Sequence, residues 1–247
     1  VTPVNFAAIA FGICDDTARI KSILDQIETR MSQENLFHWP LCFDSFRKEE
    51  VYETVNWPFP NYENGDIFLT WGYLAVRSYV KYDRDIAIKY IRKLLEQYNK
   101  DGLSSQRFSR KDQKGIGEDI LAGACTSVAA LYRDIYGLRP KWNRFGLEPN
   151  LTNLTNGTEF SYVLRNKVYK VHLKENQYEI SNDDFTVNDS QSFGIDMQGN
   201  NLRYFPGNRD KEGLMVTRSN GTPMLIDFTE WSSGNRSWKI RSVDTYK

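Results

Sequence analysis

Two kinds of helical pattern alternate through the first half of the chain. Residues 4–13 are apolar on nearly all faces, as in a buried helix. Residues 17–31 carry apolar side chains at spacings of three and four with charges between them, which predicts an amphipathic helix. Asp15 and Asp16 precede this stretch and offer an N-cap. The chain therefore opens with a buried helix followed by a surface helix.

This pair of patterns recurs along the chain. Residues 67–80 and 120–136 again have the buried pattern, and residues 84–99 again have the amphipathic one. Two polar segments without regular periodicity, 32–65 and 100–119, separate them. A repeat of about 60 residues with alternating buried and amphipathic helices predicts the inner and outer helices of a helical toroid or solenoid. Since both polar segments precede inner helices, we expect them on one face, around a cleft.

The second half of the chain has a different period. From Gly137 the helical pattern stops, and short alternating runs follow, separated by Asn-Gly, Gly-Asn and Asn-Asp turns. Examples are residues 159–165, 167–174, 214–219 and 223–229. We therefore predict an α+β protein with a helical domain over 1–138, part of a toroid or solenoid of alternating helices, and an antiparallel β-sandwich over 139–247.

Composition narrows the partners and cofactors. In 247 residues, Lys+Arg and Asp+Glu both number 32, so no basic surface is expected for nucleic acid or an anionic membrane. No apolar run reaches the length of a membrane span. Three distant cysteines (Cys14, Cys42 and Cys125) and only two histidines (His38 and His172) form no metal-binding motif. We expect no metal and no cofactor.

The first polar segment ends in Asn-Tyr-Glu-Asn-Gly-Asp, residues 61–66, which suits a sugar. Aromatic faces cover C–H surfaces, amides and carboxylates bind hydroxyls, and carboxylates also supply the proton transfers of glycoside chemistry. The segment itself is either functional or an Ω-like loop packed by its own aromatics. The candidate substrate-binding residues of the two segments are Tyr62, Asn64, Asp66, Trp71, Trp39, Gln106 and Arg107.

The candidate catalytic residues are Glu63, Glu118 and Asp119, and each has an alternative role. Glu63 is either a general base or substrate ligand, or a loop carboxylate that accepts backbone amides. Asp66 binds substrate or caps the helix that follows it. Of Glu118 and Asp119, one caps the last inner helix and the other faces the cleft as the catalytic base. Trp71 either stacks on sugar or belongs to the core.

Several segments resemble the inverting disaccharide phosphorylases of the cellobiose and chitobiose phosphorylase type, within the (α/α)6-barrel clans. Residues 63–68 are similar to their Glu-Asn-Gly-Gly-Ile-Phe segment. Residues 131–140, Leu-Tyr-Arg-Asp-Ile-Tyr-Gly-Leu-Arg-Pro, resemble their last barrel helix and its closing turn. Residues 145–149 match the first strand of their C-terminal β-domain, and residues 8–28 their helix pair. The resemblance spans about the first 150 residues and implies that the helical domain is part of a sugar-processing (α/α)6 toroid.

Two departures from that family argue against phosphorolysis. The family has a phosphate-binding His after Ile-Phe, whereas Leu69-Thr70-Trp71-Gly72 stands here. The Ser/Thr-rich phosphate loop is replaced by Gly117-Glu118-Asp119-Ile120, whose carboxylates would repel phosphate. A carboxylate at that place is what an inverting hydrolase needs to activate water. The resemblance with these changes implies a glycoside hydrolase.

The resemblance covers only the later half of the family's barrel, and the family's general acid lies in the earlier half. Val1-Thr2-Pro3 lacks the basic start of a signal peptide, so the chain starts mature or as a fragment. We expect the C-terminal portion of a hydrolase of oligo- or polysaccharides, completed by an N-terminal barrel half in the same protein or another chain, outside the cytoplasm (periplasmic or secreted). The alternatives are a non-catalytic carbohydrate-binding or structural half and, third, a phosphorylase.

Overall fold

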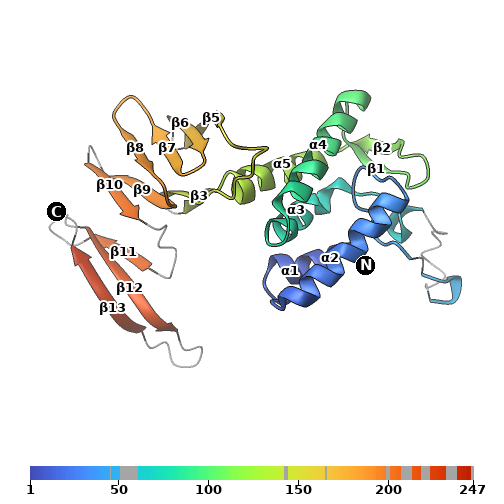
Figure 1. Cartoon of the computed structure of the whole chain (residues 1–247), viewed down its shortest axis with the longest axis horizontal. Coiled ribbons are helices and arrows are strands. Elements are labelled where there is room, and N and C mark those ends of the chain that lie inside the picture. The colour runs from blue at the N-terminus through green and yellow to red at the C-terminus, as the bar shows by residue number, and fades with distance from the viewer. Residues whose placement is uncertain are drawn as a thin grey trace. The chain divides into compact units, whose positions relative to one another are not determined.

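The computed structural model describes residues 1–44, 46–50, 61–141, 144–164, 166–198, 201–206, 213–217, 223–231 and 238–245. These residues form α-helices and antiparallel β-sheets, which confirms the predicted α+β class (Figure 1). The chain divides into two compact units. Unit 1 comprises Val1–Tyr136 and Asn150–Asn156, and unit 2 comprises Gly137–Pro149 and Gly157–Lys247.

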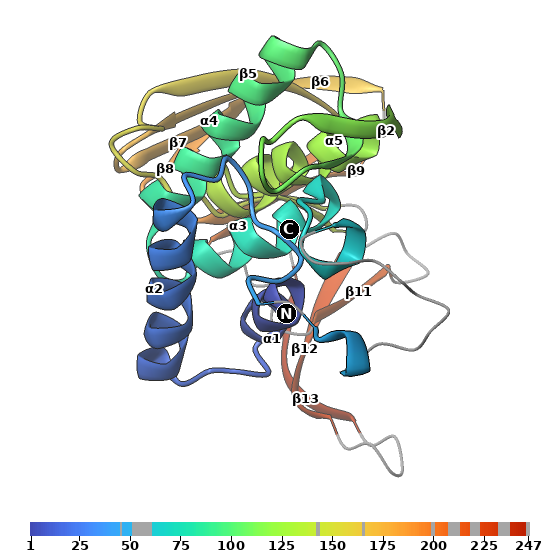
Figure 2. The same cartoon turned by 90° about the vertical axis from the view of Figure 1, so that its right-hand side faces the viewer.

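The helices of unit 1 follow the predicted order of buried and amphipathic segments. They are α1 (Thr2–Ala10), α2 (Thr17–Gln33), α3 (Gly72–Val80), α4 (Arg84–Asp101) and α5 (Leu121–Ala130), which a π-helix, η4 (Leu131–Ile135), continues. Helix α3 packs against α1, α4 and α5 (Figure 2). The hydroxyl of Ser78 in α3 donates a hydrogen bond of 2.9 Å to the Phe6 carbonyl in α1. The three apolar helices are therefore neighbours.

Capping residues set where the amphipathic helices begin and end. Asp16 precedes α2, and its carboxylate accepts a hydrogen bond of 2.9 Å from the backbone amide of Arg19, as predicted. Asp83 caps α4 through the amides of its first turn. Helix α4 stops at Gly102, which adopts the left-handed conformation (φ +71°) at no steric cost.

One carboxylate joins the two amphipathic helices to the core of unit 1. Glu28 of α2 accepts hydrogen bonds from the Tyr79 hydroxyl of α3 (2.8 Å) and the Tyr90 hydroxyl of α4 (3.1 Å). Its carboxylate also pairs with Lys89 at 2.7 Å. Burial raises the pKa of both tyrosines, so their hydroxyls stay protonated donors. The Trp39 ring stacks on Tyr79 with the ring centres 5.7 Å apart.

Two predicted boundaries in unit 1 are wrong. Helix α3 begins at Gly72, because residues 67–71 make a bridge and a 3-10 turn, η3 (Leu69–Trp71), before it. The segment 100–119, predicted as a loop, contains the hairpin β1 (Ser105–Phe108) and β2 (Gly115–Asp119). The hairpin was missed because β2 is exposed along its whole length and so lacks the alternation of a half-buried strand.

The strands of unit 2 confirm the predicted alternating runs. The described strands are β3 (Leu138–Lys141), β4 (Arg144–Leu147), β5 (Thr158–Leu164), β6 (Lys167–Lys174), β7 (Gln177–Ser181), β8 (Thr186–Asp189), β9 (Phe193–Gln198), β10 (Asn201–Pro206), β11 (Gly213–Thr217), β12 (Pro223–Trp231) and β13 (Trp238–Thr245). They form antiparallel sheets in the orders β10-β9-β4-β3, β5-β6-β7-β8 and β11-β12-β13. Phe145 of β4 contacts Tyr162 of β5 and Tyr169 of β6, with ring centres 5.4 and 5.3 Å apart. This contact joins the first two sheets.

Candidate functional site

The turn at residues 61–66 is closed by its own last residue. Tyr62 begins a short 3-10 helix, η2 (Tyr62–Asn64), with positive φ (+49°), and Gly65 also has positive φ (143°). The Asp66 amide donates a hydrogen bond of 2.9 Å to the Tyr62 carbonyl, and the Asp66 carboxylate accepts one of 2.7 Å from the Tyr62 amide. Because Asp66 lies four residues after Tyr62, its amide and its carboxylate can both bond to the Tyr62 backbone and close the turn.

Asp66 also joins this turn to the hairpin more than forty positions away. Its carboxylate is ion-paired with Arg107 and accepts a hydrogen bond of 3.3 Å from the Arg110 amide. Asp66 is 1% exposed. The predicted cap on the next helix is wrong, because the N-cap of α3 is Trp71, which makes no side-chain cap bond. Asp66 is thus a buried carboxylate with partners on both oxygens, and it holds two loops together.

Asn64 and Arg110 hold a third segment, residues 42–44 and 46, against the same turn. Asn64 is buried, and its side-chain oxygen accepts a hydrogen bond of 3.0 Å from the Phe46 amide. Arg110 forms two bonds to Glu34, at 2.6 and 2.7 Å, and donates to the Cys42 carbonyl at 2.7 Å. A guanidinium with two parallel bonds to one carboxylate is strongly oriented. The loops are therefore fixed by two buried side chains, Asn64 and Arg110.

The segments that precede α3 and α5 lie side by side. Ile67 pairs in an antiparallel bridge with Phe108 of β1, with backbone bonds of 2.9 and 2.8 Å. The Thr126 hydroxyl of α5 lies 3.3 Å from the Leu69 carbonyl in η3. Gly123 permits this close approach, because an added Cβ would lie 3.2 Å from the Leu69 Cβ. Both polar segments therefore occupy one region of unit 1.

The predicted catalytic residues are distributed unevenly around this contact. Glu63 lies in η2 and Glu118 in β2, and both side chains are exposed. Glu118 has no hydrogen bond or ion pair to any described residue. Asp119 is exposed at the residue level, yet its carboxylate accepts a hydrogen bond of 2.9 Å from the Ser104 amide. Asp119 thus closes the hairpin, whereas Glu63 and Glu118 face solvent.

The predicted substrate-binding residues separate into buried and accessible groups. Trp39 is 4% exposed and packs in the aromatic core, where its faces are covered by Tyr79 and Tyr90. Trp71, the last residue of η3, is 41% exposed. Gln106 is exposed, and the Arg107 guanidinium lies 5.4 Å from the Tyr62 ring centre. Of the predicted residues, Trp71 and Gln106 are exposed and Tyr62 and Arg107 are partly buried, whereas Asn64, Asp66 and Trp39 are buried and hold the fold.

The sequence did not predict that His38 would be a buried polar group next to Gly72 at the start of α3. His38 is 1% exposed, and within the described part of the chain neither ring nitrogen makes a well-formed hydrogen bond. The Ser127 hydroxyl of α5 is buried without such a partner as well. Both approach Gly72, where an added Cβ would lie 2.0 Å from Ser127 Oγ and 2.7 Å from His38 Nε2. Burial lowers the pKa of His38 to about 3, and the Trp39 backbone opposes this only in part.

Comparison with known proteins gives no family for this chain, so a function can be proposed only from the geometry of the site. The sequence matches no family model and no curated protein. In the described ranges, no group of three or more His, Cys, Asp or Glu side chains is arranged to hold a metal ion. Across the same residues, no helix combines the length and the apolar character needed to span a bilayer.

Proposed function

We propose that this chain is the C-terminal portion of a glycoside hydrolase that cleaves glycosidic bonds with inversion. The observation that carries the proposal is the pairing of the two polar segments through Ile67 and Phe108, with the Asp66–Arg107 ion pair beside it. Convergence of these segments is what a carboxylate site drawn from both of them requires. The buried ion pair gives that region the rigidity that positioned acid–base chemistry needs.

In this proposal Glu118 is the general base that activates water. It is exposed and has no partner among the described residues, so its carboxylate is available to accept a proton. Glu63 is the second accessible carboxylate and binds substrate hydroxyls or shares the proton transfer. Asp119 orients the hairpin through the Ser104 amide rather than reacting. An inverting reaction needs its acid and base about 6.5–9.5 Å apart, which leaves room for the water.

The substrate is an oligo- or polysaccharide. Trp71 and Tyr62 offer aromatic faces for the C–H side of a sugar ring. Gln106 and Arg107 offer donors for its hydroxyls, and Arg107 is held in place by Asp66. The proposed hydrolysis takes place outside the cytoplasm and uses no cofactor.

The proposal includes the architecture of both units, a partial (α/α)6 toroid in unit 1 and a β-sandwich in unit 2. The packing of α3 between α1 and α5 supports an inner helical layer of an (α/α)6 toroid. The contact of Phe145 with Tyr162 and Tyr169 supports a β-sandwich in unit 2. By resemblance to the phosphorylase clan, the general acid would come from a preceding barrel segment, in the same protein or in another chain.

A second candidate function is a non-catalytic carbohydrate-binding or structural half, and exposed apolar residues favour it. Val4, Phe11 and Ile13 are 64%, 59% and 81% exposed, and Leu121 of α5 is 52% exposed. Apolar side chains exposed in this way promote association. Size-exclusion chromatography of the isolated chain tests this candidate: self-association without activity fits it, and a clean monomer would weaken the idea of a half-barrel with an exposed apolar edge. Phosphorolysis is disfavoured by the carboxylates at residues 118–119.

The test is hydrolysis of an oligosaccharide panel by the full-length protein, with and without phosphate, followed by NMR of the product anomer. Glu118→Gln should lower the hydrolytic rate by about 10²–10⁴ without changing the fold, because a general base is removed. Glu96→Gln, an exposed carboxylate of α4, is the matched control and should leave the rate unchanged. Full activity of both Glu118→Gln and Glu63→Gln would refute the proposal.

A further inference from the structure

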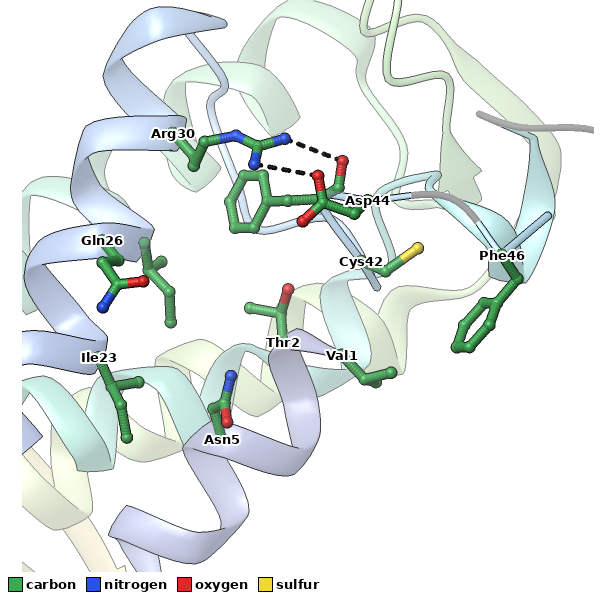
Figure 3. Close-up of a pocket in the computed structure, with 11 residues that line it drawn as sticks. Val1, Thr2, Asn5, Ile23, Gln26, Arg30, Cys42, Asp44 and Phe46 are labelled. Atoms are coloured by element: carbon green, nitrogen blue, oxygen red, sulfur yellow. Dashed lines mark hydrogen bonds and ion pairs between the residues drawn. The ribbon is translucent and has the colours of Figure 1, made fainter. Parts of the chain in front are cut away.

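A pocket of about 250 Å³ opens in unit 1 between α1, α2 and the segment that carries Cys42, Phe43, Asp44 and Phe46 (Figure 3). None of the residues predicted from the sequence as catalytic or substrate-binding lines it. Helix α1 contributes Asn5 to its lining. The pocket is therefore a separate feature of the same unit.

The two charged side chains that line this pocket, Arg30 and Asp44, pair with each other. Arg30 of α2 pairs with Asp44 at 3.1 Å between Nη1 and Oδ1, and its Nη2 donates a bond of 3.0 Å to the Phe43 carbonyl. The guanidinium also lies 5.2 Å from the Phe43 ring centre. A guanidinium with a carboxylate partner has no excess charge to attract an anion, and the carboxylate has none to attract a cation. A neutral ligand fits this balance best.

The remaining lining combines amides with apolar surface. The Asn5 side chain makes no hydrogen bond to any described residue, so its donor and acceptor are both available. Gln26 lies across the pocket, and Figure 3 shows Thr2, Asn5 and Gln26 around the same hollow as the Arg30–Asp44 pair. Ile23 and Ile27 supply the apolar part. A ligand that carries hydroxyl groups on an otherwise apolar C–H surface would match such a lining.

The wall formed by residues 42–44 and 46 is held in place before any ligand binds. Arg110 donates hydrogen bonds to the Cys42 and Phe43 carbonyls, at 2.7 and 3.0 Å. Asn64 holds the Phe46 amide at 3.0 Å. A preformed wall lowers the ordering cost of binding. The pocket is thus anchored on the buried network that also shapes the turn at residues 61–66.

We propose that this pocket binds one neutral pyranose unit, or a polyol of that size, independently of any hydrolysis. Its volume lies just below the range of pockets for drug-sized ligands, which suits a single ring rather than a chain. Asn5 and Gln26 bind ring hydroxyls, the Arg30–Asp44 pair supplies one donor and one acceptor edge, and Ile23 covers the C–H face. The proposal stands on this lining and does not rest on the proposed function.

The experiment is an amide NMR titration of the full chain with glucose, N-acetylglucosamine and myo-inositol, and with phosphate as a charged comparison. At least one neutral ligand should shift the amides of Thr2, Asn5 and residues 23–30, 42–44 and 46. Asn5→Ala and Gln26→Ala should each weaken binding about fivefold to tenfold, the equivalent of one hydrogen bond. Asn99→Ala, an exposed amide on α4, should leave binding unchanged.

The outcomes separate this proposal from the proposed function. Shifts confined to residues 61–71 and 104–119 would support carbohydrate recognition there and overturn the pocket. Tighter binding of phosphate than of any neutral ligand would overturn the neutral class. Both variants binding as tightly as the unmodified protein, with unchanged circular dichroism, would overturn the residue assignment. Hydrolysis lost in Glu118→Gln with pocket binding retained would show that the two sites are independent.

Discussion

The turn at residues 61–66 and strand β2 carry the same kinds of polar side chain and use them in opposite ways. In the turn, Asn64 and Asp66 point inward and bind backbone and arginine groups. Every residue of β2 is exposed, including Glu118. The two segments are neighbours through β1, so proximity to a site does not decide the role of a carboxylate. Its burial and its partners decide that role.

The strongest test of this comparison is Asp66→Ala. Its loss leaves the Arg107 guanidinium and the Tyr62 amide without their buried acceptor, so we expect about 3–5 kcal/mol less stability. Urea unfolding followed by circular dichroism measures this. Glu63→Ala, three residues earlier and exposed, is the matched control and should change stability by less than about 0.5 kcal/mol. Similar losses for the two variants would remove the distinction between inward and outward carboxylates.

His38 allows a pH test of the polar groups buried beneath the loops. Its pKa falls from 6.5 to about 3 on folding, so the unfolded chain binds the extra proton between these values. Stability from this group is complete above pH 6.5 and is lost as the pH falls, by about 1.4 kcal/mol per pH unit. We expect His38→Leu to reduce this slope. Parallel stability curves for the two proteins between about pH 6.5 and 4 would contradict the prediction.

Gly72→Ala probes the close approach of α3 to His38 and Ser127. The added methyl group would overlap Ser127 Oγ, so we expect a loss of about 1–3 kcal/mol. In the Ser127→Ala background the hydroxyl is absent, and the loss should shrink by at least about 0.5 kcal/mol. A double-mutant cycle from thermal unfolding measures this coupling. Additive effects would show that the two residues do not meet.

The smallest expected effect on stability is that of Glu118→Ala. Because the side chain is exposed and unpaired among the described residues, unfolding free energy should change by less than about 0.5 kcal/mol. Urea unfolding at neutral pH measures it. Asp119→Ala is the informative neighbour, since it removes the acceptor of the Ser104 amide and should cost about 1–2 kcal/mol. A larger loss for Glu118 than for Asp119 would reverse their proposed roles.

The sequence by itself determined the features that depend on neighbouring residues. The apolar spacing between residues 17 and 31 predicted α2, Asp16 predicted its cap, and the change of period at Gly137 coincides with the start of unit 2. Alternation predicted β6 and β12. These signals are local, because helix and strand periods are read within about ten to eighteen residues.

Tertiary structure alone decided which polar residues are available for chemistry. Asp66 and Glu63 are carboxylates of one six-residue turn, but only Asp66 meets Arg107 and Arg110, more than forty positions away. The exposed hairpin strand β2, the buried His38 and the pocket beside Asn5 likewise depend on segments that are remote in sequence. Burial and pairing are properties of the packed chain, so no local pattern encodes them.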